Sequence, residues 1–472
     1  MENKDGISES YFHREWRREI IIYMGKLFGT DGVRGIANQE LTGELAYQLG
    51  RAGAYVLTKE LHHQPKILVG TDTRRSKDML ESAFMAGVCS IGGYGISLGV
   101  IPTPAVAYLT RHYQADAGVV ISASHNPMEY NGIKFFDNNG YKLRDALEEE
   151  IENIIFHEFT SLPNPIGREV GKLGIGPTSS IDYLKFLKTT IEGDLQGLSI
   201  AIDCANGAAY KIAPLLFQEL GAKVYTMGVK PDGININDKC GSTYLKPLQQ
   251  FVKQTKVDIG IALDGDADRC LAIDENGEVV DGDQILAICG QRMKEQGILK
   301  KDTIVATVMS NIGLVKMGQK NNISIQQCSV GDRYVLETMM ENGYNLGGEQ
   351  SGHTIFLDKN TTGDGLVTAL QLLQVLKEKK KPLSQLKKVI SIYPQVLINV
   401  KVSNGNKNKY LEDPVIKEAI HRLQEIFSNE GRVLIRPSGT EPLIRIMLEG
   451  KDQEVLLIEA KKLSEIIQQR LG

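Results

Sequence analysis

The sequence contains no hydrophobic run of the roughly 18 residues that a membrane-crossing helix needs. Its apolar stretch Ile20-Ile21-Ile22 is too short for the core of a signal peptide and is preceded by arginine and glutamate. The six cysteines are scattered without a CxxC pair, in a chain too long to need disulfide stapling. These absences argue against an anchored or secreted protein, and we expect a cytoplasmic one with reduced thiols.

A strong charge of either sign is also lacking, because 54 basic residues stand against 58 acidic ones and the net charge is −4. A chain balanced in this way is not drawn as a whole to nucleic acid or to anionic membranes. We therefore expect neither as a partner, and any anionic ligand must be held by local clusters. A homodimer stays open at this stage.

The order of sequence patterns predicts several α/β domains. At roughly 100–200 residues per domain, 472 residues correspond to three or four domains. Short β-rich runs alternate with helical patterns, as in 66–69 followed by 77–91. ADAGVVISASHNP (115–127) and VDIGIALDGDADR (257–269) share a start and an apolar strand, and 344–360 is a weaker third copy. We therefore expect three related mixed α/β domains.

The end of the chain has a different pattern, which predicts a smaller α+β domain. Its expected elements are strand 395–402, helix 410–427, strands 432–436 and 443–448, and helix 453–469. Turn-rich stretches place the domains at 24–175, 176–279, 280–390 and 391–472. Residues 1–23 are polar and charged, and we expect them to form a mobile extension.

The first candidate site is SASHNP (122–127), which follows the apolar run 118–121. Ser124 could accept a phosphoryl group if a cation lies beside it and a base removes its proton. Lys134 supplies a positive charge nearby in the sequence. Serine, asparagine and proline also form ordinary turns, so this motif alone does not separate catalysis from a turn.

The second candidate site is LDGDADR, in which Asp264, Asp266 and Asp268 alternate directly after an apolar strand. Alternate residues of an extended chain point to one side. Three close carboxylates repel one another unless a hard divalent cation holds them, and Mg²⁺ is favoured where phosphate completes the shell. The sequence therefore predicts a metal site.

Two other interpretations of this loop fit its residues less well. An EF-hand would use Glu275 at the twelfth position, but Arg269 stands where that loop needs glycine, and a strand precedes it instead of a helix. A haloacid-dehalogenase-type phosphotransferase would use Asp264 as the nucleophile, but it leaves Ser124 and Arg436 unexplained.

Two further motifs suit a phosphorylated sugar. In GGEQSGH (347–353), Glu349, Ser351 and His353 offer hydroxyl-binding groups at alternating positions, while nearby Asp332 is expected to cap a helix. RPSGTEP (436–442) combines a guanidinium, two hydroxyls and a glycine, which together bind a phosphate dianion. A simple hairpin would leave the arginine and the threonine of this motif unexplained.

Taken together, the motifs resemble those of the α-D-phosphohexomutase superfamily, and within it the phosphoglucosamine mutase family. The matching segments, in order, are KLFGTDGVRGIAN (26–38), SASHNPMEYNGIKFF (122–136), DGDADR (264–269), GGEQSGH (347–353), TTGDG (361–365) and RPSGTEPLIRIM (436–447). The glutamine of GEQSGH and the SGTEP form of the phosphate loop are similar to the glucosamine branch. Residues 1–23, Thr71 and Met128 depart from the usual pattern.

The resemblance implies four domains around a central cleft and a phosphoserine mechanism. It implies interconversion of glucosamine 6-phosphate and glucosamine 1-phosphate through a sugar 1,6-bisphosphate, feeding UDP-N-acetylglucosamine synthesis. Mg²⁺ would be held by Asp264, Asp266, Asp268 and an oxygen of phospho-Ser124. A phosphomannomutase or phosphoglucomutase, a phosphatase and a non-catalytic sugar-phosphate-binding protein are the alternatives.

The same resemblance implies a role for each remaining site residue. The phosphate that is not transferred would be gripped by Arg436, Ser438, Gly439 and Thr440. Sugar hydroxyls would be held by Glu349 and Ser351, and moving charge would be stabilised by Arg34, Lys134 and Arg269. The first choice for proton transfer is Lys134, followed by His353 and His125.

Overall fold

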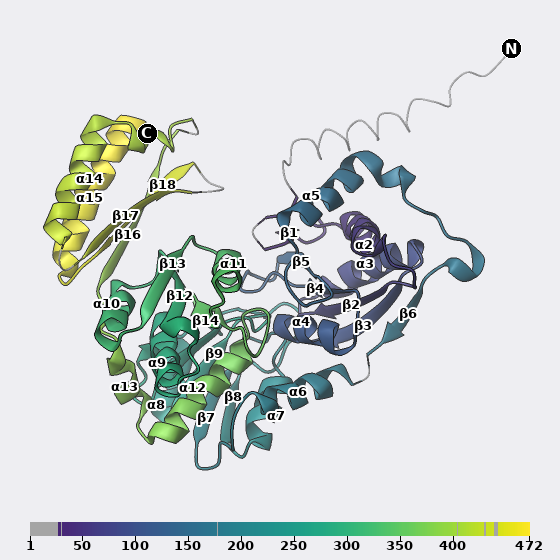
Figure 1. Cartoon of the computed structure of the whole chain (residues 1–472), viewed down its shortest axis with the longest axis horizontal. Helices are drawn as coiled ribbons and strands as arrows, with labels where there is room; N and C mark the ends of the chain where they lie inside the picture. The colour runs from purple at the N-terminus through teal and green to yellow at the C-terminus, as the bar shows by residue number, and fades with distance from the viewer. Residues whose placement is uncertain (1–26, 30, 177, 404, 429–430, 439–441) are drawn as a thin grey trace.

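The computed structural model describes residues 27–472 except 30, 177, 404, 429–430 and 439–441. The predicted extension 1–23 lies outside the described residues. The described residues form four sheets, each with its own helices, which we call the first, second, third and C-terminal units (Figure 1). The predicted fold class, three mixed α/β units followed by a smaller α+β unit, is confirmed.

The first unit is a six-stranded sheet in the order β1-β5-β4-β2-β3-β6, in which β5 lies antiparallel to both β1 and β4. Its strands are β1 (Val33–Ile36), β2 (Lys66–Thr71), β3 (Tyr94–Val100), β4 (Ala117–Ile121), β5 (Tyr130–Phe136) and β6 (Lys172–Ile175). Its helices are α2 (Gly43–Thr58), α3 (Lys77–Ser90), α4 (Thr103–His112) and α5 (Asp145–Asn153). Every residue of β4 is buried, because helices cover both faces of the sheet centre.

The second unit is a five-stranded sheet in the order β11-β10-β9-β7-β8. Its elements are α6 (Ser179–Thr189), β7 (Ser199–Asp203), α7 (Ile212–Glu219), β8 (Lys223–Met227), α8 (Lys246–Thr255), β9 (Ile259–Leu263), β10 (Cys270–Asp274) and β11 (Val279–Val280).

The third unit is a four-stranded sheet in the order β13-β12-β14-β15. Its elements are α9 (Gly282–Glu295), β12 (Thr303–Thr307), α10 (Ile312–Asn321), β13 (Ser324–Cys328), α11 (Asp332–Asn342), β14 (Leu346–Gly348), β15 (Thr354–Phe356), α12 (Gly365–Lys379) and α13 (Leu383–Leu386).

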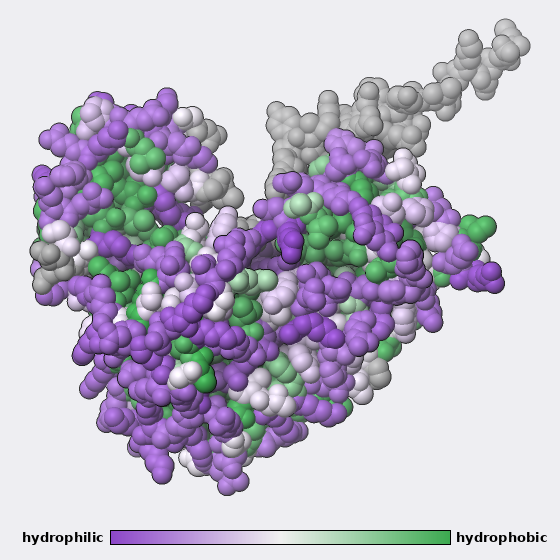
Figure 2. All heavy atoms as spheres, in the orientation of Figure 1, coloured by the Kyte–Doolittle hydropathy of each residue, from purple (hydrophilic) through white to green (hydrophobic). Residues whose placement is uncertain are grey.

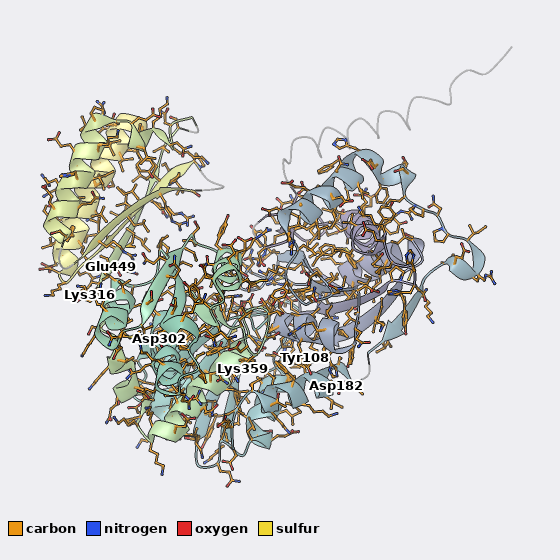
Figure 3. The ribbon with its side chains drawn as sticks, in the orientation of Figure 1. Tyr108, Asp182, Asp302, Lys316, Lys359 and Glu449 are labelled. Carbon is orange, nitrogen blue, oxygen red and sulfur yellow. The ribbon has the colours of Figure 1, made fainter. Side chains whose placement is uncertain are left out.

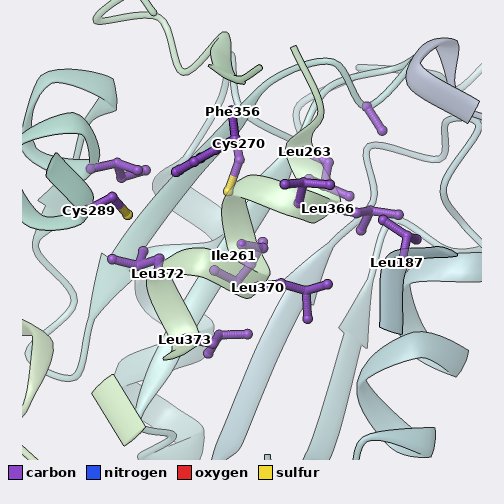
Figure 4. Packing of buried hydrophobic residues seen from close by; sticks show 14 of the residues in the cluster. Leu187, Ile261, Leu263, Cys270, Cys289, Phe356, Leu366, Leu370, Leu372 and Leu373 are labelled. Carbon is purple, nitrogen blue, oxygen red and sulfur yellow. The ribbon is translucent and has the colours of Figure 1, made fainter. Parts of the chain in front are cut away.

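One hydrophobic core joins these three units. Helix α12 of the third unit packs Leu366 and Leu370 against Ile261 and Leu263 of β9 in the second unit (Figure 4). The same cluster of buried side chains continues to α4 of the first unit. The loops that follow β4, β9 and β14 each connect a parallel strand to an antiparallel neighbour. The shared core therefore brings three equivalent loops, with their polar motifs, to one region.

The C-terminal unit is a three-stranded antiparallel sheet in the order β16-β18-β17, with two helices. Its elements are β16 (Gln395–Lys401), α14 (Pro414–Phe427), β17 (Arg432–Pro437), β18 (Leu443–Glu449) and α15 (Gln453–Leu471). The expected start of the first helix at residue 410 is wrong, because the carboxylate of Asp413 accepts the N–H groups of Val415 and Ile416. Asp413 therefore caps a helix that begins with Pro414.

A buried carboxylate attaches the C-terminal sheet to the third unit. Glu449 ends β18 where the sheet meets α10, and its side chain is fully buried (Figure 3). It accepts hydrogen bonds from the backbone N–H of Ile312 at 2.9 Å and from Gln395 at 2.8 Å, and it pairs with Arg432 at 2.8 Å. Arg432 in turn donates to the carbonyl of Ser310. A buried charge requires such complete pairing.

Hydrophilic side chains predominate on the face drawn in Figure 2, and hydrophobic ones gather over the C-terminal and first units. In the part of the chain that the structure describes, no helix has both the length and the apolar character needed to cross a bilayer.

The first prediction concerns Asp283, which lies in α9 beside the joint to the C-terminal unit and accepts the N–H of Asn311 at 2.7 Å. Burial, helped by Asp281 and Glu449, raises the pKa of Asp283 from its usual 3.8 to about 7. The unfolded carboxyl ionises at lower pH, so this group's contribution to stability falls as pH rises from about 4 to about 7. We expect the wild type to lose about 2–3 kcal/mol of unfolding free energy between about pH 5 and pH 8 because of this group. The Asp283→Asn variant should not show this loss.

Urea unfolding of wild type and variant at pH 5, 6, 7 and 8 measures this difference. Asp302→Asn, at a carboxyl that is 58% exposed in the same unit, is the matched control and should follow wild type. An Asp283→Asn curve parallel to wild type at all four pH values would contradict the prediction.

Candidate active site

A cavity of about 690 Å³ opens between the first three units. It is lined by residues among 27–34 with Ser124 and His125, by Asp268 and Arg269, and by residues among 307–309, 330–332 and 349–353. This volume falls in the usual range for small-molecule sites. The predicted serine, metal and sugar motifs therefore meet at one cavity.

The serine loop is held in an unusual conformation. Ser124 is 1% exposed and has a φ of 50°, in the left-handed region that favours glycine. Such a conformation costs of the order of 1–3 kcal/mol in a non-glycine residue. Its hydroxyl donates to Asp264 Oδ2 at 2.6 Å, and His125 Nδ1 lies 3.4 Å from Ser124 Oγ. Surrounding contacts must offset the strain.

An ion pair that sequence reasoning missed supplies these contacts. The fully buried Arg74 pairs with Asp72 at 2.8 Å and donates to the carbonyls of Ser124 and Asn126. Ser122 donates to Asp72 at 2.6 Å and accepts the N–H of Ser124 at 3.0 Å. Strands β2 and β4 are parallel neighbours, so their carboxyl ends place these residues together. A charged pair directly after a buried strand was the available signal.

The three predicted metal ligands converge. Asp264, Asp266 and Asp268 are all buried and can each offer an oxygen within 4.8 Å of the others. Burial, with Asp268 and Asp266 adding to it, raises the pKa of Asp264 well above its usual value. Within the described residues, Oδ1 of Asp266 and Oδ1 of Asp268 have no hydrogen-bond partner. Buried acceptors left without donors fit a hard cation.

The structure also decides between the interpretations of this loop. The carboxylate of Glu275 accepts hydrogen bonds from the backbone N–H of Ser384, at 3.2 Å, and from the hydroxyl of Ser384. Glu275 is therefore bound to α13. With β9 in front of the loop, an EF-hand is excluded. The hydrogen bond between Ser124 and Asp264 places the serine within the site, whereas a haloacid-dehalogenase-type site would leave it without a role.

Three predicted cations surround the carboxylates. Lys134 on β5 is 2% exposed and pairs with Asp31 at 2.9 Å and with Asp266 at 3.1 Å. Burial alone would lower the pKa of Lys134, but the nearby carboxylates outweigh it and raise that pKa. Arg269 has a raised pKa for the same reason. Arg34 pairs with Asp31, so all three side chains carry positive charge near the carboxylates.

The predicted sugar-binding residues line the same cavity from the third unit. Glu349 accepts the N–H of Gly331 at 3.2 Å, and Ser351 is exposed at the cavity wall. His353 is 3% exposed, with Nδ1 3.7 Å from a carboxylate oxygen of Asp268 and Nε2 3.7 Å from one of Asp332. The histidine therefore connects the metal loop to the sugar loop.

Asp332 is not the N-cap residue of α11 as expected, because Gly331 takes that position. The carboxylate of Asp332 lies one residue further on and accepts the first-turn N–H of Arg333 at 2.9 Å. It also pairs with Lys142, which pairs with Asp31 at 2.6 Å. Asp332 thus belongs to the charge network of the cavity wall.

The predicted phosphate loop lies beside the main cavity. Arg436 and Arg445 are direct neighbours across β17 and β18, and both line a separate cavity of about 160 Å³. Met309 lines both cavities, so the two adjoin. Ser438 is 4% exposed, whereas Gly439 and Thr440 lie outside the described residues. Like charges opposite each other on a sheet are unfavourable, which makes this surface suited to an anion.

Models of the four phosphoglucomutase/phosphomannomutase domains match the chain in order. Alpha/beta/alpha domains I, II and III match residues 25–161, 181–277 and 281–393, and the C-terminal domain matches 397–465. This chain belongs to the phosphoglucomutase/phosphomannomutase family. It is therefore an enzyme, a phosphohexose mutase.

Within the phosphoglucomutase/phosphomannomutase family, the chain is similar to proteins named phosphoglucosamine mutase. It is 60% identical over 449 residues to that of Ruminiclostridium cellulolyticum, which covers 95% of this chain and 100% of the relative. It is 59% identical over 447 residues to that of Clostridium acetobutylicum, with coverages of 95% and 100%.

Solved structures share the fold at low sequence identity. A phosphoglucomutase/phosphomannomutase family protein of Burkholderia thailandensis is 21% identical, with a TM-score of 0.78 and coverages of 94% and 98%. The N-acetylphosphoglucosamine mutase of Aspergillus fumigatus, solved in complex with GlcNAc-6P and magnesium, is 17% identical, with a TM-score of 0.70 and coverages of 97% and 99%.

The second prediction tests the support of the serine loop. Ser122→Ala should leave the buried N–H of Ser124 without its acceptor and Asp72 without one donor, lowering the free energy of unfolding by about 1–3 kcal/mol. Urea unfolding measures the change. Ser161→Ala, which removes an exposed hydroxyl bonded only to a nearby carbonyl, is the control and should cost less than about 0.5 kcal/mol. Equal effects of the two substitutions would show that Ser122 does not hold the loop.

Proposed function

We propose that the protein interconverts glucosamine 6-phosphate and glucosamine 1-phosphate, carrying the transferable phosphate on Ser124. The observation that carries this proposal is the placement of the Ser124 hydroxyl 2.6 Å from Asp264, inside a group of three carboxylates and beside a sugar-sized cavity. Identities of 57–60% to phosphoglucosamine mutases favour the glucosamine substrate over the glucose and mannose ones.

We propose Mg²⁺ as the cation, held by Asp264, Asp266, Asp268 and a phosphoserine oxygen. A phosphoryl group on Ser124 adds about two negative charges to three buried carboxylates, so a divalent cation between them is the economical arrangement. When bound, the ion neutralises this charge and polarises the phosphoryl oxygens. Magnesium in the complex of the Aspergillus fumigatus relative supports the choice.

The residues of the chain then divide the reaction between them. In the first half, O1 of glucosamine 6-phosphate attacks the phosphorus on Ser124, the bond from phosphorus to Ser124 Oγ breaks, and the proton of O1 ends on the departing Oγ. In the second half, the bisphosphate has turned, Ser124 Oγ attacks the 6-phosphate, the bond from phosphorus to O6 breaks, and the proton of Oγ ends on O6. Lys134, followed by His353 and His125, is proposed to relay these protons. Because its raised pKa keeps Lys134 charged, it first gives its proton to the departing oxygen and then takes the one from the attacking oxygen.

The remaining residues bind and orient the sugar. Arg436 and Ser438, with Gly439 and Thr440, are proposed to hold whichever phosphate is not being transferred. Glu349 and Ser351 are proposed to hold sugar hydroxyls in both orientations, which converts binding into correct alignment for attack. Arg34, Lys134 and Arg269 are proposed to stabilise the charge that moves between the two oxygens.

Location and domain boundaries complete the proposal. The six cysteines are all free, which supports a reducing compartment, and we propose the cytoplasm.

We propose domain boundaries near residues 175, 280 and 390. The middle boundary moves from 279 because β11 still pairs with β10 of the second unit.

Coupled assays on glucosamine 6-phosphate, glucose 6-phosphate and mannose 6-phosphate test the activity. We expect the highest kcat/KM on glucosamine 6-phosphate, with isomer as the product. Release of inorganic phosphate in its place, or a clear preference for mannose or glucose, would overturn the assignment.

The third prediction is covalent. Active protein should carry one phosphate on Ser124, because an unmodified serine has nothing to donate to a monophosphate. Phosphopeptide mass spectrometry measures its occupancy. Ser124→Ala should lower turnover by more than about a thousandfold, since it removes the group on which the covalent pathway depends. As a control, dephosphorylated wild type should recover when a sugar 1,6-bisphosphate is added. Normal turnover in Ser124→Ala would exclude the serine mechanism.

The fourth prediction separates binding of the phosphate that is not transferred from the chemical step. Arg436→Ala should lower the affinity for both monophosphates by about ten- to hundredfold, because one charge-assisted hydrogen bond of about 1.5–3 kcal/mol is lost in either orientation of the sugar. Arg422→Ala, at a side chain 61% exposed on α14, is the control and should leave both affinities unchanged. Competition binding of the two monophosphates measures the effect. If only one of them were weakened, the two orientations would use different phosphate sites.

A further inference from the structure

Helix α4 begins directly against the metal loop, at the contact between the first and second units (Figure 1). Thr103, its first residue, is 1% exposed, and its backbone N–H donates to the carbonyl of Asp266 at 3.0 Å. Its hydroxyl donates to Asp266 Oδ2 at 2.7 Å. No motif considered in the sequence includes this threonine.

These contacts fix the orientation of one carboxylate. Lys134 donates to the same oxygen, Asp266 Oδ2, at 3.1 Å. A carboxylate accepts but cannot donate, so both bonds point from the first unit toward Oδ2. Oδ1 of Asp266 is left buried, without a hydrogen-bond partner among the described residues, in the group that it forms with Asp264 and Asp268.

The support at Asp266 differs from that of the other two carboxylates. Asp264 Oδ1 accepts the backbone N–H of Arg269 at 3.2 Å, but its Oδ2 is held by the hydroxyl of Ser124, and that hydrogen is lost whenever Ser124 carries a phosphoryl group. The cations and imidazole nearest to Asp268 lie at 3.7–4.0 Å. The bond from Thr103 is independent of the phosphorylation state, so it holds Asp266 in the same way at every stage of the reaction.

We propose that Thr103 is a positioning residue that turns Oδ1 of Asp266 toward the cation. The inference rests on the metal site of the proposed function. A purely structural role would need only the backbone N–H and the shape of the side chain, both of which valine keeps. Only the hydroxyl orients the carboxylate, and groups that orient metal ligands affect metal affinity by about 10- to 100-fold.

Calorimetric titration of MgCl₂ into the metal-stripped full chain, phosphorylated on Ser124, tests the proposal. We expect Thr103→Val to raise the Kd for Mg²⁺ by about 10- to 100-fold and Thr103→Ser, which keeps the hydroxyl, to restore it to near the wild-type value. In turnover assays, Thr103→Val should need more Mg²⁺ for half-maximal rate while approaching the wild-type kcat at saturating Mg²⁺.

Thr110→Val is the matched control, because Thr110 is fully buried on the same helix and its hydroxyl donates only to the carbonyl of Val106. It should bind Mg²⁺ as wild type does. If Thr103→Val does not fold, Thr103→Ala, which removes the γ-methyl group together with the hydroxyl, takes its place, with Thr110→Ala as its control.

Unchanged Mg²⁺ affinity in Thr103→Val, with affinity lost in Asp266→Asn, would overturn the role of Thr103 and leave the metal site intact. Failure of wild type itself to bind Mg²⁺ would overturn the metal site and the inference together. The substrate assignment is tested separately, by the coupled assays.

Discussion

Mutual repulsion among three buried carboxylates is the constraint on which the centre of this molecule depends. These carboxylates can lie close together only where positive charges and hydrogen-bond donors surround them; they belong to Asp264, Asp266 and Asp268. The first unit provides Lys134 and the hydroxyls of Ser124 and Thr103. Because these partners come from different strands and helices, the repulsion is balanced only when the first two units are docked.

The shared core makes that docking rigid. Leu366 of α12 packs on the second unit, while Asp364, at the cap of the same helix, accepts a hydrogen bond from Tyr183 at 2.7 Å. Thr361 donates to the carbonyl of Gly140 in the first unit. The TTGDG motif therefore ties the third unit to the other two. The C-terminal unit differs, since its link to the rest includes the buried carboxylate of Glu449.

Periodicity and local motifs were enough to predict the fold class, the C-terminal elements apart from the start of their first helix, and some of the residues that line the cavity. The convergence of the three aspartates was predicted from an extended chain, yet they lie in a turn after β9, with Ala267 at a φ of 57°. Asp72, Arg74 and Thr103 were not predicted. Asp72 and Arg74 stand directly after a buried strand, which is a local signal, but the serine loop that they hold lies 50 or more residues away. Asp266, the partner of Thr103, lies 163 residues away, and one sequence does not show which distant segments pair.

The span of the contacts around Ser124 has a consequence for how the protein is made. Arg74 grips the serine loop from 50 positions away, whereas Asp264 stands 140 positions further along the chain. At about 5–20 residues per second, a ribosome needs roughly 7–28 s to cover that interval. During this time the nascent chain can shape the loop within its first unit, before Asp264, Asp266 and Asp268 have been translated. The strained serine turn is thus a template onto which the later acidic segment docks.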